Sequence, residues 1–142
     1  MSVHTILVAH DGSEGAGHAL TWAVELAEQA GARVVVVHAW SPLEELGKHE
    51  PPLDFTRLHQ EALRVLTEEW CRAAQGAGVD LETRLIEDLP VPGIVQAARD
   101  VGANLIVCGT RGRGRVKQLV LGSVARDLPT KSHLPVTIVP PP

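Results

Sequence analysis

The sequence is poor in aromatic residues and in cysteine, and it has no long apolar run. Its 142 residues include three Trp, one Phe, no Tyr and two Cys. No stretch approaches the roughly 18 to 20 apolar residues that a membrane span requires. The scarcity of aromatic side chains and the formal charge of −4 argue against a nucleic-acid surface, and the charge also argues against binding to anionic membranes.

The two cysteines are expected to be buried and reduced. Cys71 falls in a predicted helix and Cys108 in a predicted strand, and no signal peptide precedes them. This pattern predicts a cytoplasmic protein. A length of 142 residues with 44% hydrophobic composition is typical of one domain, so residues 1–142 are expected to form a single unit.

Apolar runs and turn residues alternate along the whole chain. Residues 41–53 contain three prolines and are expected to form a mobile loop. Strands are predicted at 5–9, 32–40, 79–87, 104–108 and 135–139, and helices at 16–30, at 55–73, from after Pro92 to Val101, and from Ser123. Four consecutive valines in the second strand suit a strand covered on both faces. The alternation predicts an α/β fold with an open, mostly parallel five-stranded sheet and helices on both faces, which is a Rossmann-like arrangement.

Ligands of such sheets bind beyond the carboxyl ends of the strands, at the point where the strand order reverses. Three loops are expected at that edge. Asp11 follows the first strand, Ala39 and Trp40 end the second, and a glycine-rich loop follows Cys108.

The glycine-rich loop has the sequence GTRGRGRVKQLVLGS from Gly109 to Ser123. Glycines at 109, 112 and 114 allow successive backbone N–H groups to turn toward one anion. Gly122 and Ser123 then open a helix, whose first turn favours phosphate oxygens. The loop therefore predicts a phosphate-binding cradle, although the local pattern also fits a flexible turn with solvated arginines. Binding of RNA or of a DNA groove by RGRGR is the less favoured alternative.

Two common phosphate motifs are missing. No GxxxxGK[ST] follows the first strand, and no GxGxxG occurs in its turn, because Gly12, Gly15 and Gly17 have a different spacing. The histidines show no metal-ligand spacing, and His38 is interpreted as a packed or hydrogen-bonded core imidazole.

The spacing Gly109-x2-Gly112-x9-Gly122-Ser123 resembles the nucleotide-binding signature of the universal stress protein family, in its ATP-binding branch. The segments ILVAHDGS, VVVVHAW, NLIVCGTRGRG and PVTIV follow in family order over essentially the whole chain. Two features depart from the family pattern: EDLP, with Asp88, stands before the third helix, and Pro129 lies inside the last one, where it should shorten or kink it.

The resemblance implies an adenine nucleotide lying across the crevice. Asp11 would lie near the ribose, and the backbone at Ala9 and Ala39 would border the adenine. Residues expected around the phosphates are Gly109, Gly112, Gly122 and Ser123, flanked by Cys108 and Val124, with Arg111 and Arg113 reaching the phosphates or a partner. Asp11 and Ser123 could also serve only as turn and helix-cap residues.

The predicted function is a stress-response or signalling module that binds ATP, with or without Mg²⁺ or Mn²⁺, and hydrolyses it slowly or not at all, because no dedicated base stands out. The resemblance also implies a homodimer through the edge strand Val136 to Val139. An adapter of the same fold that binds no nucleotide is the alternative. An adenylylating enzyme would need a further substrate domain, for which 142 residues leave no room.

Overall fold

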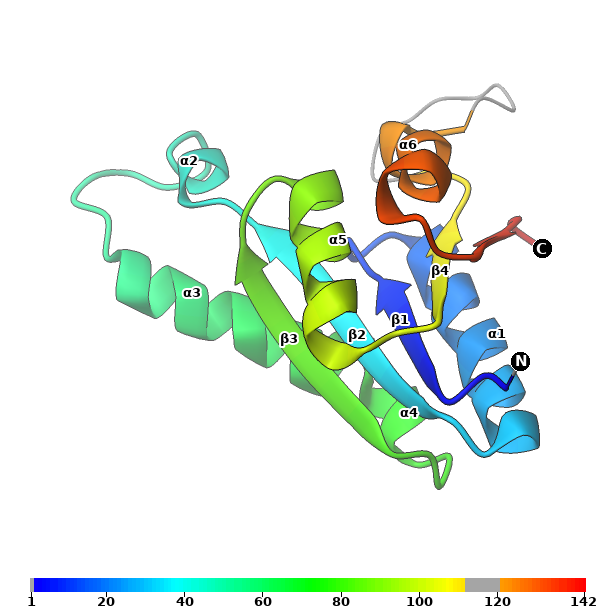
Figure 1. The fold of residues 1–142 in the computed structure, drawn as a ribbon. Coiled ribbons are helices and arrows are strands. Elements are labelled where there is room, and N and C mark those ends of the chain that lie inside the picture. The colour runs from blue at the N-terminus through cyan, green and yellow to red at the C-terminus, as the bar shows by residue number, and fades with distance from the viewer. Residues whose placement is uncertain (1, 112–120) are drawn as a thin grey trace.

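The computed structural model describes residues 2–111 and 121–142. Five parallel strands form one sheet in the order β3-β2-β1-β4-β5 (Figure 1). Their bounds are β1 Thr5–Ala9, β2 Arg33–Trp40, β3 Leu81–Glu87, β4 Leu105–Gly109 and β5 Val136–Val139. The predicted α/β class and parallel five-stranded sheet are confirmed, and β3 and β5 are the two edge strands.

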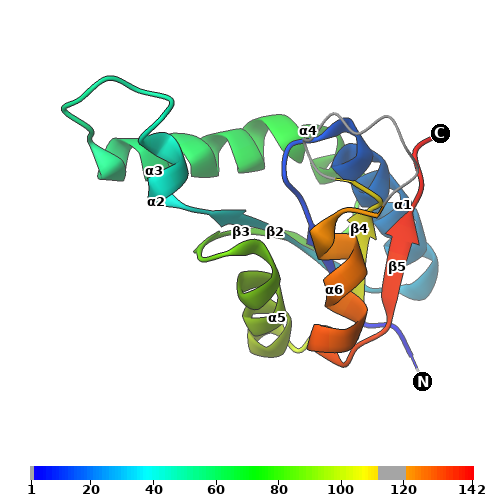
Figure 2. The same cartoon turned by 90° about the horizontal axis from the view of Figure 1, so that it is seen from above.

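Helices cover both faces of the sheet (Figure 2). One face carries α1 (Glu14–Ala30) together with a helical segment made of α3 (Phe55–Arg64), η1 (Val65–Trp70) and α4 (Arg72–Gln75), and the other carries α5 (Pro90–Val101) and α6 (Ser123–Ser132). The described chain contains no helix that is long and apolar enough to cross a membrane.

The central strands are buried on both sides, as their continuous apolar runs predict. Ile6 and Val8 of β1 point to the α1 face, whereas Leu7 and Ala9 point to the α5 face. β2 repeats this alternation with its four valines. Two apolar layers made mainly of Val, Ile, Leu and Ala therefore form the core, and the chain needs few aromatic residues to fill it.

The loop predicted at residues 41–53 contains a short helix, α2 (Pro42–Glu45), which begins with Ser41 as its N-cap. The whole of α3 lacks a buried residue, and α2 and α3 extend beyond the β3 side of the sheet (Figures 1 and 2).

Two helix starts and one cap residue differ from their predictions. α1 begins at Glu14, two residues before its predicted start at 16. α5 begins at Pro90, not after Pro92, because proline at the first helical position suits the fixed φ of that residue. α6 has Gly122 as its N-cap, in an extended conformation, so Ser123 is the first helical residue and not the cap. α6 also continues through Pro129 to Ser132.

The helix predicted at 55–73 is interrupted by one π-helical stretch, η1. A π turn holds more residues than an α turn, which changes the residues that face the core. Leu66 and Cys71, five residues apart, are both fully buried, and Ala74 is buried whereas Ala73 is exposed. The π turn thus shifts the buried face of the segment by one residue after Leu66, and Trp70 stays partly buried against the core.

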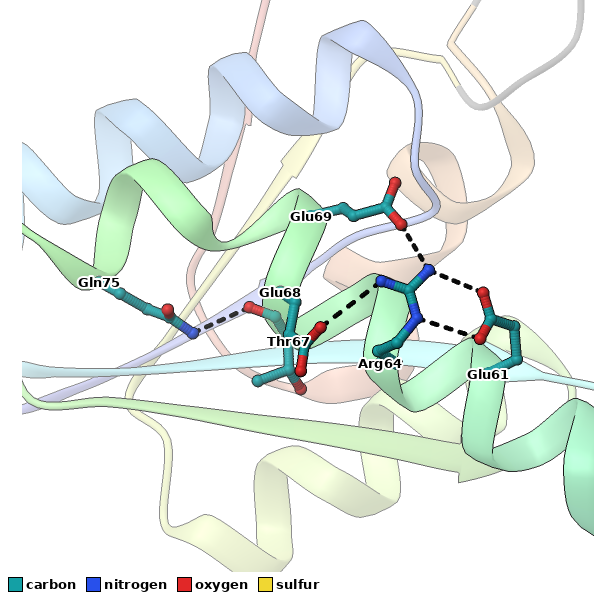
Figure 3. A network of polar contacts seen from close by, with 6 residues as sticks. All are labelled: Glu61, Arg64, Thr67, Glu68, Glu69 and Gln75. Carbon is teal, nitrogen blue, oxygen red and sulfur yellow. Dashed lines mark hydrogen bonds and ion pairs between the residues drawn. The ribbon is translucent and has the colours of Figure 1, made fainter.

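An exposed ion-pair network joins α3 to η1 (Figure 3). Arg64 Nη2 lies 2.7 Å from both Glu61 Oε1 and Glu69 Oε2, and Nη1 lies 3.5 Å from Glu68 Oε2. The hydrogen bonds that Arg64 donates to Glu61 and Glu69 raise the pKa of Arg64, and the bond that Glu61 accepts from Arg64 lowers the pKa of Glu61. Because all four side chains are exposed, the network contributes little stability, but it spans the point where the α-helix becomes a π-helix.

Candidate functional site

A cleft opens at the carboxyl ends of β1 and β4, where the strand order reverses. It is partly open to solvent and is lined by residues from the ends of β1, β2 and β4 and from the starts of α5 and α6. The switch point was the place predicted for a ligand.

Every predicted site residue that the structure describes lines this cleft. They are Ala9, Asp11, Ala39, Cys108, Gly109, Arg111, Gly122, Ser123 and Val124. Gly112, together with the further basic residues Arg113, Arg115 and Lys117, lies outside the described residues. The contribution of each predicted site residue to ligand binding stays a prediction.

Further lining residues were missed by the sequence reasoning. They are His10, Ala16, Val37, His38, Pro90, Ile94, Thr110 and Ala125. Pro90 and Ile94 come from the first turns of α5, and the unusual EDLP segment was the signal that could have placed them there. The remaining residues are immediate chain neighbours of predicted ones, apart from Val37, two positions before Ala39, and Ala16 in the first turn of α1.

The turn after β1 holds Asp11 by local hydrogen bonds. Asp11 Oδ1 accepts a bond from the Ser13 N–H at 3.0 Å, and Ser13 Oγ accepts one from the Ala16 N–H at 3.1 Å. Gly12 has φ 83°, a left-handed conformation that favours glycine. The turn role of Asp11 is therefore real, and it places the carboxyl group at the cleft.

Two histidines form the wall beside this turn. His10 Nδ1 accepts a bond from the Gly12 N–H at 3.0 Å, so the proton of the neutral ring is on Nε2. His38 Nδ1 lies 2.8 Å from the carbonyl oxygen of His10, and because a carbonyl only accepts, His38 Nδ1 carries the proton. The prediction of a hydrogen-bonded His38 is confirmed, although this residue also lines the cleft.

Gly109 has a packing role independent of any ligand. A Cβ at this position would lie 3.1 Å from the backbone carbon and oxygen of Gly15, where α1 begins. A larger residue at 109 would therefore require the end of β4 and the start of α1 to move apart by a few tenths of an ångström. Beyond it, the Gly122 N–H donates to the Thr110 carbonyl at 2.7 Å, which brings the start of α6 to the end of β4.

The first turn of α6 forms another part of the cleft wall. Ser123, Val124 and Ala125 all line the cavity. The first N–H groups of a helix have no partner within it and carry a partial positive charge, which favours anions. Gly122 supplies no side chain to cap them.

The cleft wall also contains one thiol. Cys108 is 3% exposed, and burial raises its pKa to about 11. The thiol is therefore protonated at neutral pH, and it acts as a small apolar wall group.

A doubly wound parallel sheet with a cleft at its switch point defines this protein as a Rossmann-like α/β protein. The sequence profile of the Universal stress protein family matches residues 2–140. The chain belongs to this stress-response family.

Two curated relatives match over nearly their full length, and others are longer than this chain. A universal stress protein of Thermus aquaticus is 40% identical over 141 residues, covering 95% of this chain and 97% of the relative. The stress response protein NhaX of Bacillus subtilis is 30% identical, covering 94% and 96%. Mycobacterial relatives are about twice as long, and the match covers 44% of the Mycobacterium tuberculosis protein Rv2005c.

Solved structures share the fold. The protein MJ0577 superposes with a TM-score of 0.83 at 26% identity, covering 100% of this chain and 99% of the other. A universal stress protein solved with cAMP gives 0.71 at 27% identity, covering 98% of both chains. One from Archaeoglobus fulgidus solved with dAMP gives 0.69 at 30% identity, covering 98% and 99%.

Proposed function

We propose that the cleft binds an adenine nucleotide, with ATP as the working ligand, and that the chain is a nucleotide-dependent stress-response or signalling module. One observation carries the proposal. A carboxyl-bearing turn at Asp11 and the uncapped start of α6 line a single cleft at the switch point of the sheet.

The relatives support the class of ligand. Two solved universal stress proteins, at 27% and 30% identity, were crystallised with cAMP and with dAMP. Both ligands contain adenine, a sugar and a phosphate group, so the features to be recognised are shared with ATP.

Each part of the cleft suits one part of such a nucleotide. The apolar side chains of Val37 and Ile94 offer contact to an adenine ring, with the Ala39 backbone at its edge. The Asp11 carboxylate can accept hydrogen bonds from ribose hydroxyls. The first turn of α6 can donate backbone hydrogen bonds to phosphate oxygens, and Arg111 adds a positive charge.

The proposal includes slow or no hydrolysis. Hydrolysis of ATP needs a base or positioning group for the attacking water. Among the described lining residues, Asp11 is the one carboxylate, and the Nδ1 atoms of His10 and His38 both take part in backbone hydrogen bonds. The described residues contain no group of three or more metal-ligating side chains, so a Mg²⁺ or Mn²⁺ ion would be held largely by the phosphates.

The setting proposed for this activity is the cytoplasm. Cys71 and Cys108 are both buried free thiols, which suits a reducing compartment.

Thermal unfolding with magnesium and millimolar ATP, against GTP and against no nucleotide, tests the proposal. Ligand at about 100 times its dissociation constant adds about 2.7 kcal/mol to the free energy of unfolding. For a domain of this size we expect the midpoint to rise by roughly 5 to 10 °C with ATP and not with GTP.

Asp11→Asn provides the matched variant. Asn keeps an oxygen that can accept the Ser13 N–H bond but removes the charge, so the turn is retained while ribose binding is weakened. We expect the affinity for ATP to fall about tenfold or more, since hydrogen bonds to charged groups contribute about 1.5 to 3 kcal/mol. If no adenine nucleotide shifts the midpoint of the wild-type protein, the proposal is wrong and the adapter function takes its place.

A further inference from the structure

Trp70 lies against the two histidines of the cleft wall. Its ring stacks on His10 with centroids 4.9 Å apart and an interplanar angle of 13°, and it meets His38 edge-on, also at 4.9 Å, with an angle of 79°. Trp70 itself is not among the residues that line the cleft. It is therefore placed to support the wall without touching a ligand.

The contacts continue from Trp70 to Asp11 through His10. The His10 ring is held on its face by Trp70, and its Nδ1 accepts the Gly12 N–H. Its carbonyl oxygen accepts the bond from His38 Nδ1, and its own N–H donates to the Val37 carbonyl at 2.8 Å. His10 is 5% exposed. The ring, the carbonyl group and the backbone N–H of His10 are therefore all held by contacts. Together they fix the start of the turn that contains Asp11.

The π-helical stretch explains why Trp70 reaches this position. Trp70 is the last residue of η1, and the wider turn places both Leu66 and Cys71 in the core. Trp70 precedes Cys71 and so lies at the border of the buried face, next to the end of β1. π-helical turns are frequent at functional sites.

We propose that Trp70 is a positioning residue for the candidate site: it stacks on His10 and so holds the His10–Gly12 turn that presents Asp11 to the ligand. One consequence of this inference rests on the proposed function, namely that nucleotide affinity depends on a side chain behind the cleft. Its structural half, the hold on the turn, does not depend on any ligand.

Amide hydrogen exchange of the protein without ligand tests the structural half. Trp70→Leu removes the aromatic face, and we expect the Gly12 N–H to exchange about tenfold faster than in the wild-type protein. Trp70→Phe keeps an aromatic face and should restore most of the protection. Trp22→Leu is the matched control, because Trp22 is an exposed residue of α1, and the Gly12 exchange should not change.

Titration with ATP tests the functional half. Trp70→Leu should weaken binding about two- to tenfold, which is the range expected for the loss of one aromatic stacking contact. His10→Asn keeps an acceptor at the position of Nδ1 and should bind more tightly than His10→Leu, which has none. These two variants remain informative if Trp70→Leu folds poorly.

A double-mutant cycle separates positioning from general stability. If Trp70 acts through Asp11, Trp70→Leu should weaken binding far less in the Asp11→Asn background than in the wild-type background. Additive losses in the cycle, or unchanged Gly12 exchange in Trp70→Leu, would overturn the inference. Absence of ATP binding by the wild-type protein would instead overturn the proposed function and with it the effect on affinity, while the exchange measurement would still decide whether Trp70 holds the turn.

Discussion

At the residue scale, Gly109 shows that a motif glycine can be required by packing alone. Its position in the glycine spacing suggested a phosphate contact, yet the structure gives it a second reason to be glycine. The end of β4 runs so close to the start of α1 that a methyl group would meet the Gly15 backbone. Gly109 is thus required by packing and, in addition, by the predicted phosphate contact. Measuring stability without ligand tests the packing requirement alone.

We predict that Gly109→Ala lowers the free energy of unfolding by about 1 to 3 kcal/mol, the cost of overpacking a contact whose neighbour is backbone. The midpoint should fall by roughly 2 to 12 °C, at about 2 to 4 °C per kcal/mol. Gly17→Ala is the control, because a Cβ there meets nothing within 4 Å and alanine favours the α1 helix. Equal midpoints for Gly109→Ala and wild type would show that the packing argument is wrong.

The buried thiols predict how stability changes in alkaline solution. Burial raises the pKa of Cys71 and of Cys108 from an ordinary value near 9 to about 11. An unfolded chain releases these protons near pH 9, whereas the folded chain keeps them until about pH 11. The stability that comes from burying the neutral thiols is therefore complete below pH 9 and is lost as the pH rises toward 11.

Urea unfolding at a series of pH values between 8 and 11 measures this loss. The midpoint concentration should fall across the series, and a double variant, Cys71→Ala with Cys108→Ala, should show a shallower decline. An equally steep decline in the double variant would assign the effect to other groups.

At the element scale, strands and simple helix ends were predictable, whereas changes within a helix were not. Continuous valine runs and cap residues are local signals. α1 ends at Ala30 as predicted, just before its Gly31 cap, and it begins directly after the Ser13 cap, two residues before its predicted start. The π turn of η1 has no such signal, because it results from fitting Leu66, Cys71 and Ala74 against the sheet. The early start of α5 did have a local signal, because Pro90 is a favourable first helical residue. Pro92 would be equally favourable as the first residue, so the sequence did not decide between the two starts.

Pro129 remains inside α6, so this helix carries a defect that substitution can remove. Proline lacks the N–H that would bond to the Ala125 carbonyl, and it disfavours a helix interior by about 3 kcal/mol relative to alanine. Pro129 is exposed, so a smaller side chain leaves no cavity. We predict that Pro129→Ala raises the free energy of unfolding by about 1 to 2 kcal/mol, less than the full difference because proline also restricts the unfolded chain.

Thermal unfolding of Pro129→Ala checks this prediction, with Thr130→Ala as a control at the next exposed helical position. A lower midpoint for Pro129→Ala would mean that the local shape produced by proline is needed for packing between α6 and α5.

At the scale of the whole molecule, the sequence predicted which residues meet at the switch point but not which side chains pack behind them. Asp11, Ala39, Cys108 and Gly122 follow from topology, because strand ends and helix starts converge at one edge. The stack of Trp70 on His10 joins residues sixty positions apart in different elements, and no periodicity or spacing encodes it. Parts of the site that depend on strand order could be predicted, and parts that depend on side-chain packing could not.

The two edges of the sheet differ in how they are protected. β3 carries the exposed ion pair of Glu82 and Arg84, with 2.9 Å between the charged atoms, and charges of this kind discourage pairing with another strand. β5 has the uncharged sequence VTIV and is half-buried along its length. Of the two edges, β5 is the one suited to pairing with a second copy.

We therefore predict a homodimer formed through β5, from Val136 to Val139. Light scattering at micromolar concentration should give twice the mass of the chain. Thr137→Lys should shift the mass toward that of the monomer, because a lysine on an edge strand opposes pairing. Glu82→Lys, which places the same side chain on the β3 edge, is the matched control and should leave the mass unchanged. A monomer in the wild-type protein, or an equal effect of both lysines, would contradict a dimer built from β5.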